Sequence, residues 1–310
     1  MAKDKKIVVG ALNITMHPHS PQKYVDLFRA ASRNKKPVKI YGDQSGLLVG
    51  AGKLDESLFS KSKSKTSLNP ISGDIFKFAD IDLDSEWFNT ETNKFASDGE
   101  LKDLSLPENL KPNSSRFSYI FYPNNHILVY EGYYNGKSLA PQNAVRFFEN
   151  LLNTAPLQRK FGKIDVTHEP ETNALDQALN MKHKDKITMV INRPNADHLA
   201  EAERDFLKQL TELNAEKQEI SYKAASQDGL KLTKSVETIA RVAARNGEVS
   251  VRGKDGSNKP QEFSTKNHPL IETEYYNPDA SIPFSIFSSI AERIKDEIVK
   301  RLSLSKKRST

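Results

Sequence analysis

The amino-acid sequence predicts an α+β fold with mixed, largely antiparallel sheets, hairpins and packed helices, arranged as two lobes. First, short runs of β-branched and aromatic residues are interspersed with amphipathic stretches of helical period. Second, several strand-like runs are joined by short turns, which is typical of antiparallel pairing. Third, the chain has 310 residues, of which 37% are hydrophobic, and this suffices for one large core or two ordinary ones.

The first half of the chain predicts strands and hairpins with two helices. Residues 7–16 are apolar and rich in β-branched side chains, which favours a strand. Ser20 and Pro21 then indicate a helix start, because serine caps helix N-termini and proline suits the first helical position. That helix extends through about Ser32. The other predicted elements are strands 38–41, 47–52, 73–81, 117–122 and 126–132, and a helix over 140–152.

The second half predicts strands alternating with helices. The strands are 163–168, 187–192, 219–224, 248–252 and 271–276, with a polar loop before the last, and the helices are 172–181, 197–215, 233–246 and 283–302. We therefore expect an N-terminal α+β lobe over 1–162, with an acidic excursion at about 82–115. A C-terminal α/β-type lobe follows over 163–302, and 303–310 form a basic tail that hangs free.

Composition excludes several classes of protein. The chain has no cysteine, which rules out disulfides, Fe–S clusters, thiolate zinc sites and cysteine nucleophiles. No apolar run approaches 18 residues, and the N-terminus lacks the features of a signal peptide. The expectation is a cytoplasmic protein without a membrane partner.

The charge distribution indicates an anionic partner. The formal net charge is +6, and residues 223–259 have eight basic and four acidic side chains. Basic stretches bind phosphate backbones without reading sequence, although many are simply solvated faces. Arg241 and Arg245 are four residues apart and would share one helix face. The predicted nucleic-acid contacts are Lys234, Arg241, Arg245, Arg252, Lys254, Lys306, Lys307 and Arg308.

A second candidate site has metal-ligating residues. His17 and His19 follow the first strand, and a His-x-His pair can place two imidazoles on one divalent metal. Asp197 and His198 follow the apolar strand 187–192 and could join them. This pattern would fit a metal-dependent nuclease or phosphoesterase. The alternative is that both histidines line the start of the first helix; no cofactor is then expected.

The last predicted helix has an aliphatic stripe with two interpretations. Phe287, Ile290, Ile294 and Ile298 recur at helical spacing. The stripe is either part of the core or a contact with a protein partner or second copy. A non-catalytic interaction or assembly module, acting through this helix and the acidic excursion, is therefore a third hypothesis.

Three segments resemble an uncharacterised bacterial family, a domain of unknown function associated with mobile elements and anti-phage defence. They are KKIVVGALNITMHPHSPQKYVDLF, YIFYPNNHILVYEG and ITMVINRPNAD. The resemblance implies one component of a bacterial defence or toxin–antitoxin system. Combined with the basic segments, it makes a non-catalytic, nucleic-acid-associated protein the leading hypothesis.

Overall fold

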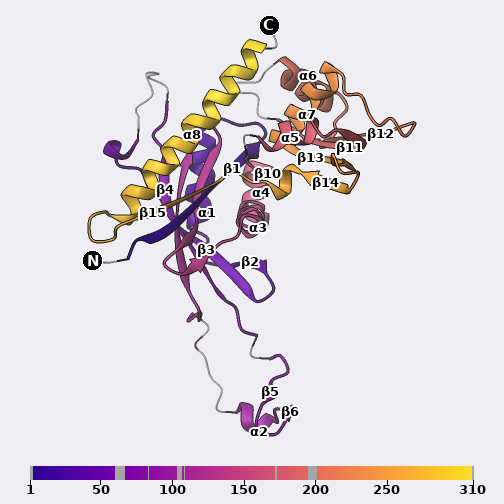
Figure 1. Ribbon diagram of the computed structural model, residues 1–310. Coiled ribbons are helices and arrows are strands. Elements are labelled where there is room, and N and C mark those ends of the chain that lie inside the picture. Colours follow the sequence, from indigo (N-terminus) through magenta and orange to yellow (C-terminus); the bar gives the residue numbers. More distant parts are fainter. Residues whose placement is uncertain are drawn as a thin grey trace.

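The computed structural model describes residues 3–59, 67–82, 84–102, 107, 109–171, 173–194 and 201–308, with the backbone alone at 201–202 and 302–308. It confirms the predicted α+β fold. Within these residues, the chain forms a nine-stranded sheet, a four-stranded sheet, a two-stranded hairpin and the helices that pack on them (Figure 1). Strand pairing is antiparallel in all three sheets.

The large sheet has the order β10-β1-β8-β7-β4-β3-β2, with β15 paired to β1 and β9 to β8. Its strands are β1 (Lys5–Met16), β2 (Val38–Tyr41), β3 (Gln44–Lys53), β4 (Ile71–Ala79), β7 (Ser115–Tyr122), β8 (Ile127–Tyr134), β9 (Lys137–Ser138), β10 (Ile164–His168) and β15 (Ile271–Tyr276). β1 is apolar along nearly its whole length because helices cover both of its faces.

Helices α1 (Pro21–Ser32), α3 (Pro141–Leu152) and α4 (Ala155–Phe161) cover one face of this sheet. The Ser20 hydroxyl accepts a hydrogen bond from the Lys23 backbone N–H, which caps α1 as the sequence predicts. The short helix η1 (Glu56–Leu58) follows β3. Helices α1, α3 and α4 enclose the larger apolar core, whereas Leu58 of η1 packs against the cluster on the opposite face of the sheet.

Helix α8 (Pro283–Arg308) covers the opposite face, lying along the sheet as the long yellow helix of Figure 1. Phe287, Ile290, Ile294 and Ile298 are buried against β1, β7 and β8. The aliphatic stripe is therefore core and does not face a partner. The helix also continues to Arg308, where a free tail was expected, because no glycine or proline interrupts the chain after Pro283.

The second lobe is inserted between two strands of the large sheet. Pro170 forms a bridge with Pro269, and Leu270 N–H donates to the Glu169 carbonyl (2.8 Å), so the chain enters and leaves the lobe side by side. The sheet topology thus divides the chain differently from the expected boundary at 162/163: β10, β15 and α8 belong with the first lobe.

The inserted lobe is a four-stranded sheet of order β12-β11-β13-β14 with helices on one face. Its elements are α5 (Ala174–Leu179), β11 (His183–Asn192), α6 (Glu201–Glu212), β12 (Lys217–Lys223), α7 (Lys234–Asn246), β13 (Gly247–Lys254), β14 (Pro260–Ser264) and η2 (Thr265–Asn267). β14 lies in the segment expected to be a polar loop.

The acidic excursion contains regular structure of its own. It forms the hairpin β5 (Phe88–Asn89) and β6 (Lys94–Phe95) and the short helix α2 (Asp98–Leu101). These elements project away from both lobes at the bottom of Figure 1. They contribute no residue to the three buried apolar clusters found among the described residues.

Candidate functional site

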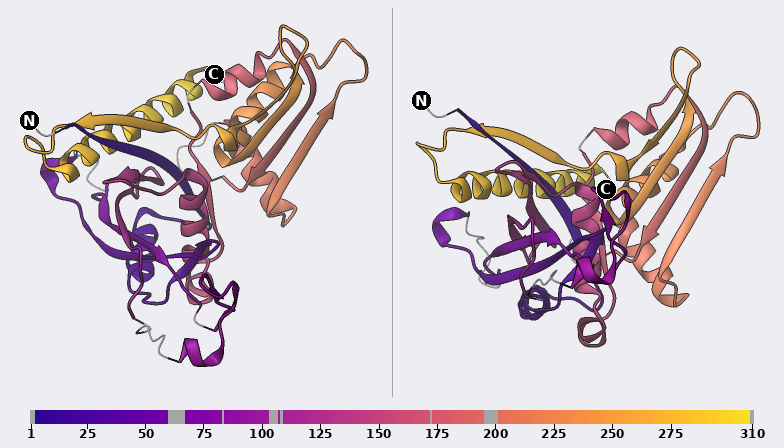
Figure 2. Two further views of the ribbon diagram at one scale, coloured as in Figure 1. Left: turned by 60° about the horizontal axis from the view of Figure 1, so that its bottom comes forward. Right: turned by 90° about the horizontal axis from the view of Figure 1, so that it is seen from below.

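The small sheet has one face without helices. Along β11, Ile187, Met189 and Ile191 are buried beneath α5 and α7. Lys186 and Thr188 alternate with them and point to the other side, because successive strand residues face opposite ways. Figure 2 shows this side turned away from the large sheet, with no helix over it. We call it the open face.

A row of basic side chains crosses the open face. Lys186 on β11 lies opposite Lys223 on β12 and opposite Arg252 on β13, and Arg252 lies opposite Glu262 on β14. Directly opposed residues in antiparallel strands have Cβ atoms about 5 Å apart. Three cations on three neighbouring strands are therefore adjacent. Lys254, two residues beyond Arg252, is on the same face.

This row is only partly neutralised. Arg252 Nη2 lies 3.4 Å from Glu262 Oε2, with both side chains exposed. No carboxylate among the described residues forms an ion pair with Lys186 or Lys223, and both lysines are exposed. Directly opposed like charges destabilise a sheet. The arrangement therefore favours an anion that lies across the strands.

The next row of the open face has hydroxyl groups. Thr188 lies opposite Ser221 and Ser250, and Ser250 lies opposite Ser264. Phe263 instead packs on the face of Ile187 and Val251, beneath the helices, and Tyr222 is on that same face but is exposed at the sheet edge. Among the described strand residues, the open face thus offers cations, hydroxyl donors and the carboxylates of Glu219, Glu248 and Glu262, but no aromatic ring. Its chemistry suits phosphate groups and not base stacking.

The two arginines predicted to share a helix face both lie on α7 but differ in exposure and in ion-pair partner. Arg241 is exposed and pairs with Asp176 (Nη2–Oδ1, 2.8 Å). Arg245 is mostly buried between the lobes, where it pairs with Glu203 (3.4 Å). Lys234 is exposed at the start of α7. The side chains of Lys306, Lys307 and Arg308 lie outside the described part of the chain.

Arg252 and Lys254 are the predicted contacts that the structure brings together. Sequence reasoning missed Lys186 and did not single out Lys223. The sequence does indicate that Lys186 and Lys223 are exposed, because each lies on the polar side of a strand with alternating residues. Only the pairing register places them side by side.

The predicted histidine pair lies at the junction of the lobes. The His17 and His19 rings are 6.2 Å apart between centroids, and His126, which sequence reasoning did not link to them, is 5.0 Å from His19. His17 Nε2 is 3.1 Å from the Arg193 carbonyl oxygen. Burial lowers the pKa of His17 and raises that of the neighbouring Asp165.

These groups do not form a complete metal site. Over the described ranges, no cluster of three or more His, Asp or Glu side chains has an arrangement able to hold a metal ion. Asp197 and His198 lie outside the described residues. Arg193, whose carbonyl contacts His17, precedes Asp197 by four residues in the sequence.

Polar groups also form hydrogen bonds between the two lobes. The Arg245 carbonyl accepts hydrogen bonds from Asn13 Nδ2 (3.4 Å) and Thr167 Oγ1 (3.3 Å). Next to Thr167, burial lowers the pKa of His168 to about 4, so this imidazole is neutral near pH 7. The seam between the lobes thus includes hydrogen bonds, and Lys163 of the first lobe also forms an ion pair with Glu216 of the inserted lobe.

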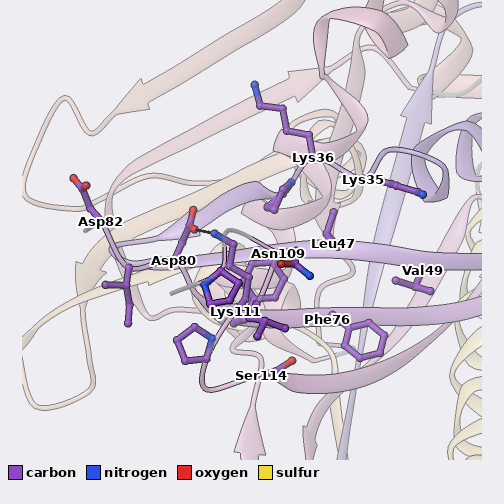
Figure 3. Close-up of a pocket in the computed structure, with 16 residues that line it drawn as sticks. Lys35, Lys36, Leu47, Val49, Phe76, Asp80, Asp82, Asn109, Lys111 and Ser114 are labelled. Atoms are coloured by element: carbon purple, nitrogen blue, oxygen red, sulfur yellow. Dashed lines mark hydrogen bonds and ion pairs between the residues drawn. The ribbon is translucent and has the colours of Figure 1, made fainter. Parts of the chain in front are cut away.

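A separate hollow of about 840 Å³ lies on the large sheet. Figure 3 shows Leu47, Val49 and Phe76 on its strands, and Lys111 paired with Asp80 (2.7 Å). The amino groups of Lys35 and Lys36 point away from one another in this view. The charged groups therefore do not converge on one point, as a catalytic site would require.

Among the described residues, no helix combines the length and the apolarity needed to cross a bilayer.

A comparison with curated proteins gives no match. The family described as "Domain of unknown function (DUF4747)" matches residues 5–292. This match covers all three sheets, and therefore the inserted lobe, and ends within α8. The chain therefore belongs to the DUF4747 family.

Proposed function

We propose that this protein binds the phosphate backbone of nucleic acid, without catalysis, through the open face of its inserted lobe. One observation is the main support: the row Lys223–Lys186–Arg252 crosses three adjacent strands, and two of its cations have no ion pair with a described carboxylate. An anion across the row would relieve the repulsion and release the counterions of the nucleic acid.

The absence of an aromatic ring from the described part of the open face sets the expected mode of binding. Cations and hydroxyl groups contact phosphates and sugars, and such contacts are largely independent of sequence. Four cations (Lys186, Lys223, Arg252 and Lys254) would give a slope of log affinity against log salt of about −3.6 on duplex DNA. As part of the same proposal, the protein acts in the bacterial cytoplasm as one component of an anti-phage or toxin–antitoxin system, the context that the resemblance implies.

The test is a salt titration of binding to labelled single- and double-stranded DNA and RNA. The double variant K186E/K223E replaces exposed side chains, so we expect it to fold normally and to bind roughly tenfold or more weakly, with a shallower salt slope. R241E is the matched control, because Arg241 lies on α7 and already pairs with Asp176. If R241E weakens binding and K186E/K223E does not, the helix patch predicted from sequence is correct and the open face is not the site.

A second candidate is a metal-dependent nuclease that uses His17 and His19. The specific observation in its favour is the contact of His17 with Arg193, just before the segment with Asp197 and His198. Incubation of the same nucleic acids with Mn²⁺ tests it. Cleavage by the wild type that is lost in H17A would replace the binding proposal with this one.

A further inference from the structure

Strand β15 is an edge of the large sheet, and among the described residues no strand pairs with its outer side. It pairs with β1 on one side only, through the register Lys5–Gly10 against Tyr276–Ile271. Ile271 is 41% exposed and Tyr275 66% exposed, and both occupy the face opposite α8. An edge of this kind is a template for another strand.

The edge strands β12, β14, β2 and β10 have features that oppose such pairing. β12 has Lys217 and Lys223 at its two ends, and β14 begins with Pro260. β2 has only four residues and an irregular register beside Lys39. β10 is covered by the inserted lobe, through Thr167 and Arg245. By contrast, β15 contains no lysine and no proline.

The charges of β15 are already balanced by α8. Arg293 pairs with both Glu272 and Glu274, which project from the α8 face of the strand. The opposite face presents Ile271, Thr273 and Tyr275, an alternation of β-branched and aromatic side chains. These residue types form favourable cross-strand pairs.

We propose that two copies of this chain associate by antiparallel pairing of β15 with β15, about a two-fold axis at Thr273. A two-fold axis perpendicular to the sheet keeps each side chain on its own face. With Thr273 at the centre, Ile271 of each copy lies opposite Tyr275 of the other. The strand is therefore complementary to itself, which is the requirement for an isologous dimer.

On the α8 face, the same register places acidic side chains opposite one another, and Arg293 balances their charge. Glu272 of one copy lies opposite Glu274 of the other, which would repel if both were bare. The Arg293 side chain of each copy lies between its own two carboxylates and offsets this repulsion. A register shifted by one residue would bring side chains from opposite faces together and is excluded by the alternation.

Cysteine cross-linking tests both the dimer and its register, because the natural chain has no cysteine. In T273C the two thiols would lie opposite one another within disulfide reach. We expect a covalent dimer on a non-reducing gel after mild oxidation. I271C mixed with Y275C should also cross-link, whereas I271C alone should not. T273C that stays monomeric, or cross-links no faster than the exposed edge control Y41C, would overturn the proposal.

Light scattering of the uncross-linked protein gives an independent measurement. Wild type should have the mass of two chains at high concentration, and I271K/Y275K should have the mass of one. Tyr222 is a matched control, since it is also an exposed aromatic on an edge strand, and Y222K should remain dimeric. A monomeric wild type, or a dimer that persists in I271K/Y275K, would contradict pairing through β15.

Discussion

Glu131 is a carboxylic acid buried within the large sheet, with 3% of its surface exposed. The ladder between β7 and β8 ends at the pair Tyr119–Tyr130. The next residue of β7, Ser118, donates its backbone N–H to the Glu131 carboxylate (2.6 Å). The Glu131 side chain therefore accepts the hydrogen bond that a carbonyl group of a paired strand would otherwise accept. Burial raises the pKa of Glu131 from its ordinary 4.5 to about 7.

This pKa predicts how the E131Q variant responds to pH. The folded protein retains the proton at a higher pH than the unfolded chain does, so the free energy of unfolding falls as pH rises from about 4.5 to 7. Glutamine resembles the protonated acid. The free energy of unfolding of E131Q should equal that of wild type at about pH 4.5. Above pH 7 it should be higher than that of wild type by up to about 3 kcal/mol.

Urea unfolding of both proteins across this pH range measures the effect. The difference between the two curves isolates Glu131, because contributions of other groups, such as His168, cancel. A difference that does not change with pH would show that Glu131 titrates normally.

At the scale of single elements, the sequence predicts well wherever local pattern and packing agree. Helix α1 has the predicted bounds, and β1 extends the predicted strand by two residues, because periodicity and capping suffice there. β14 is missed, since its short segment PQEFS has no clear alternation and is a strand only through pairing with β13. The open face is missed for the same reason: a row across strands depends on register. The spacing of Arg241 and Arg245 correctly indicates a helix, but burial of Arg245 between the lobes separates their roles.

A substitution in helix α8 tests whether its aliphatic stripe is part of the core or a surface that binds a partner. Phe287 is fully buried between α8 and the sheet, so F287A should lower the free energy of unfolding by about 3–5 kcal/mol in denaturant titration. Ile282, just before the helix, is 73% exposed, and I282A should change little. If F287A were as stable as wild type, the stripe would not be core and a partner surface would again be possible.

At the scale of the whole molecule, the lobes meet through a polar seam. The residues of β1 and β10 that face the inserted lobe include Asn13, Thr15, Asp165 and Thr167. The apolar clusters of the large sheet do not include residues of the inserted lobe. The first lobe therefore has its own core on each face of its sheet, and contact with the second lobe adds hydrogen bonds and the ion pair between Lys163 and Glu216.

This architecture predicts that the inserted lobe can be removed. Its two ends are joined by the Pro170–Pro269 bridge and by the bond from Glu171 N–H to the His268 carbonyl (2.9 Å), so a short Gly/Ser linker can replace 172–267 without stretching β10 or β15. Removal exposes mainly hydroxyl, amide and carboxyl groups, which water can satisfy. We expect the shortened chain to unfold cooperatively and to retain its strand and helix signal by circular dichroism. It should also lose nucleic-acid binding, because Lys186, Lys223, Arg252 and Lys254 are all removed. A shortened chain that is unfolded would show that the two lobes form one cooperative unit. A folded one that still binds with the same salt slope would place the phosphate contacts on the first lobe.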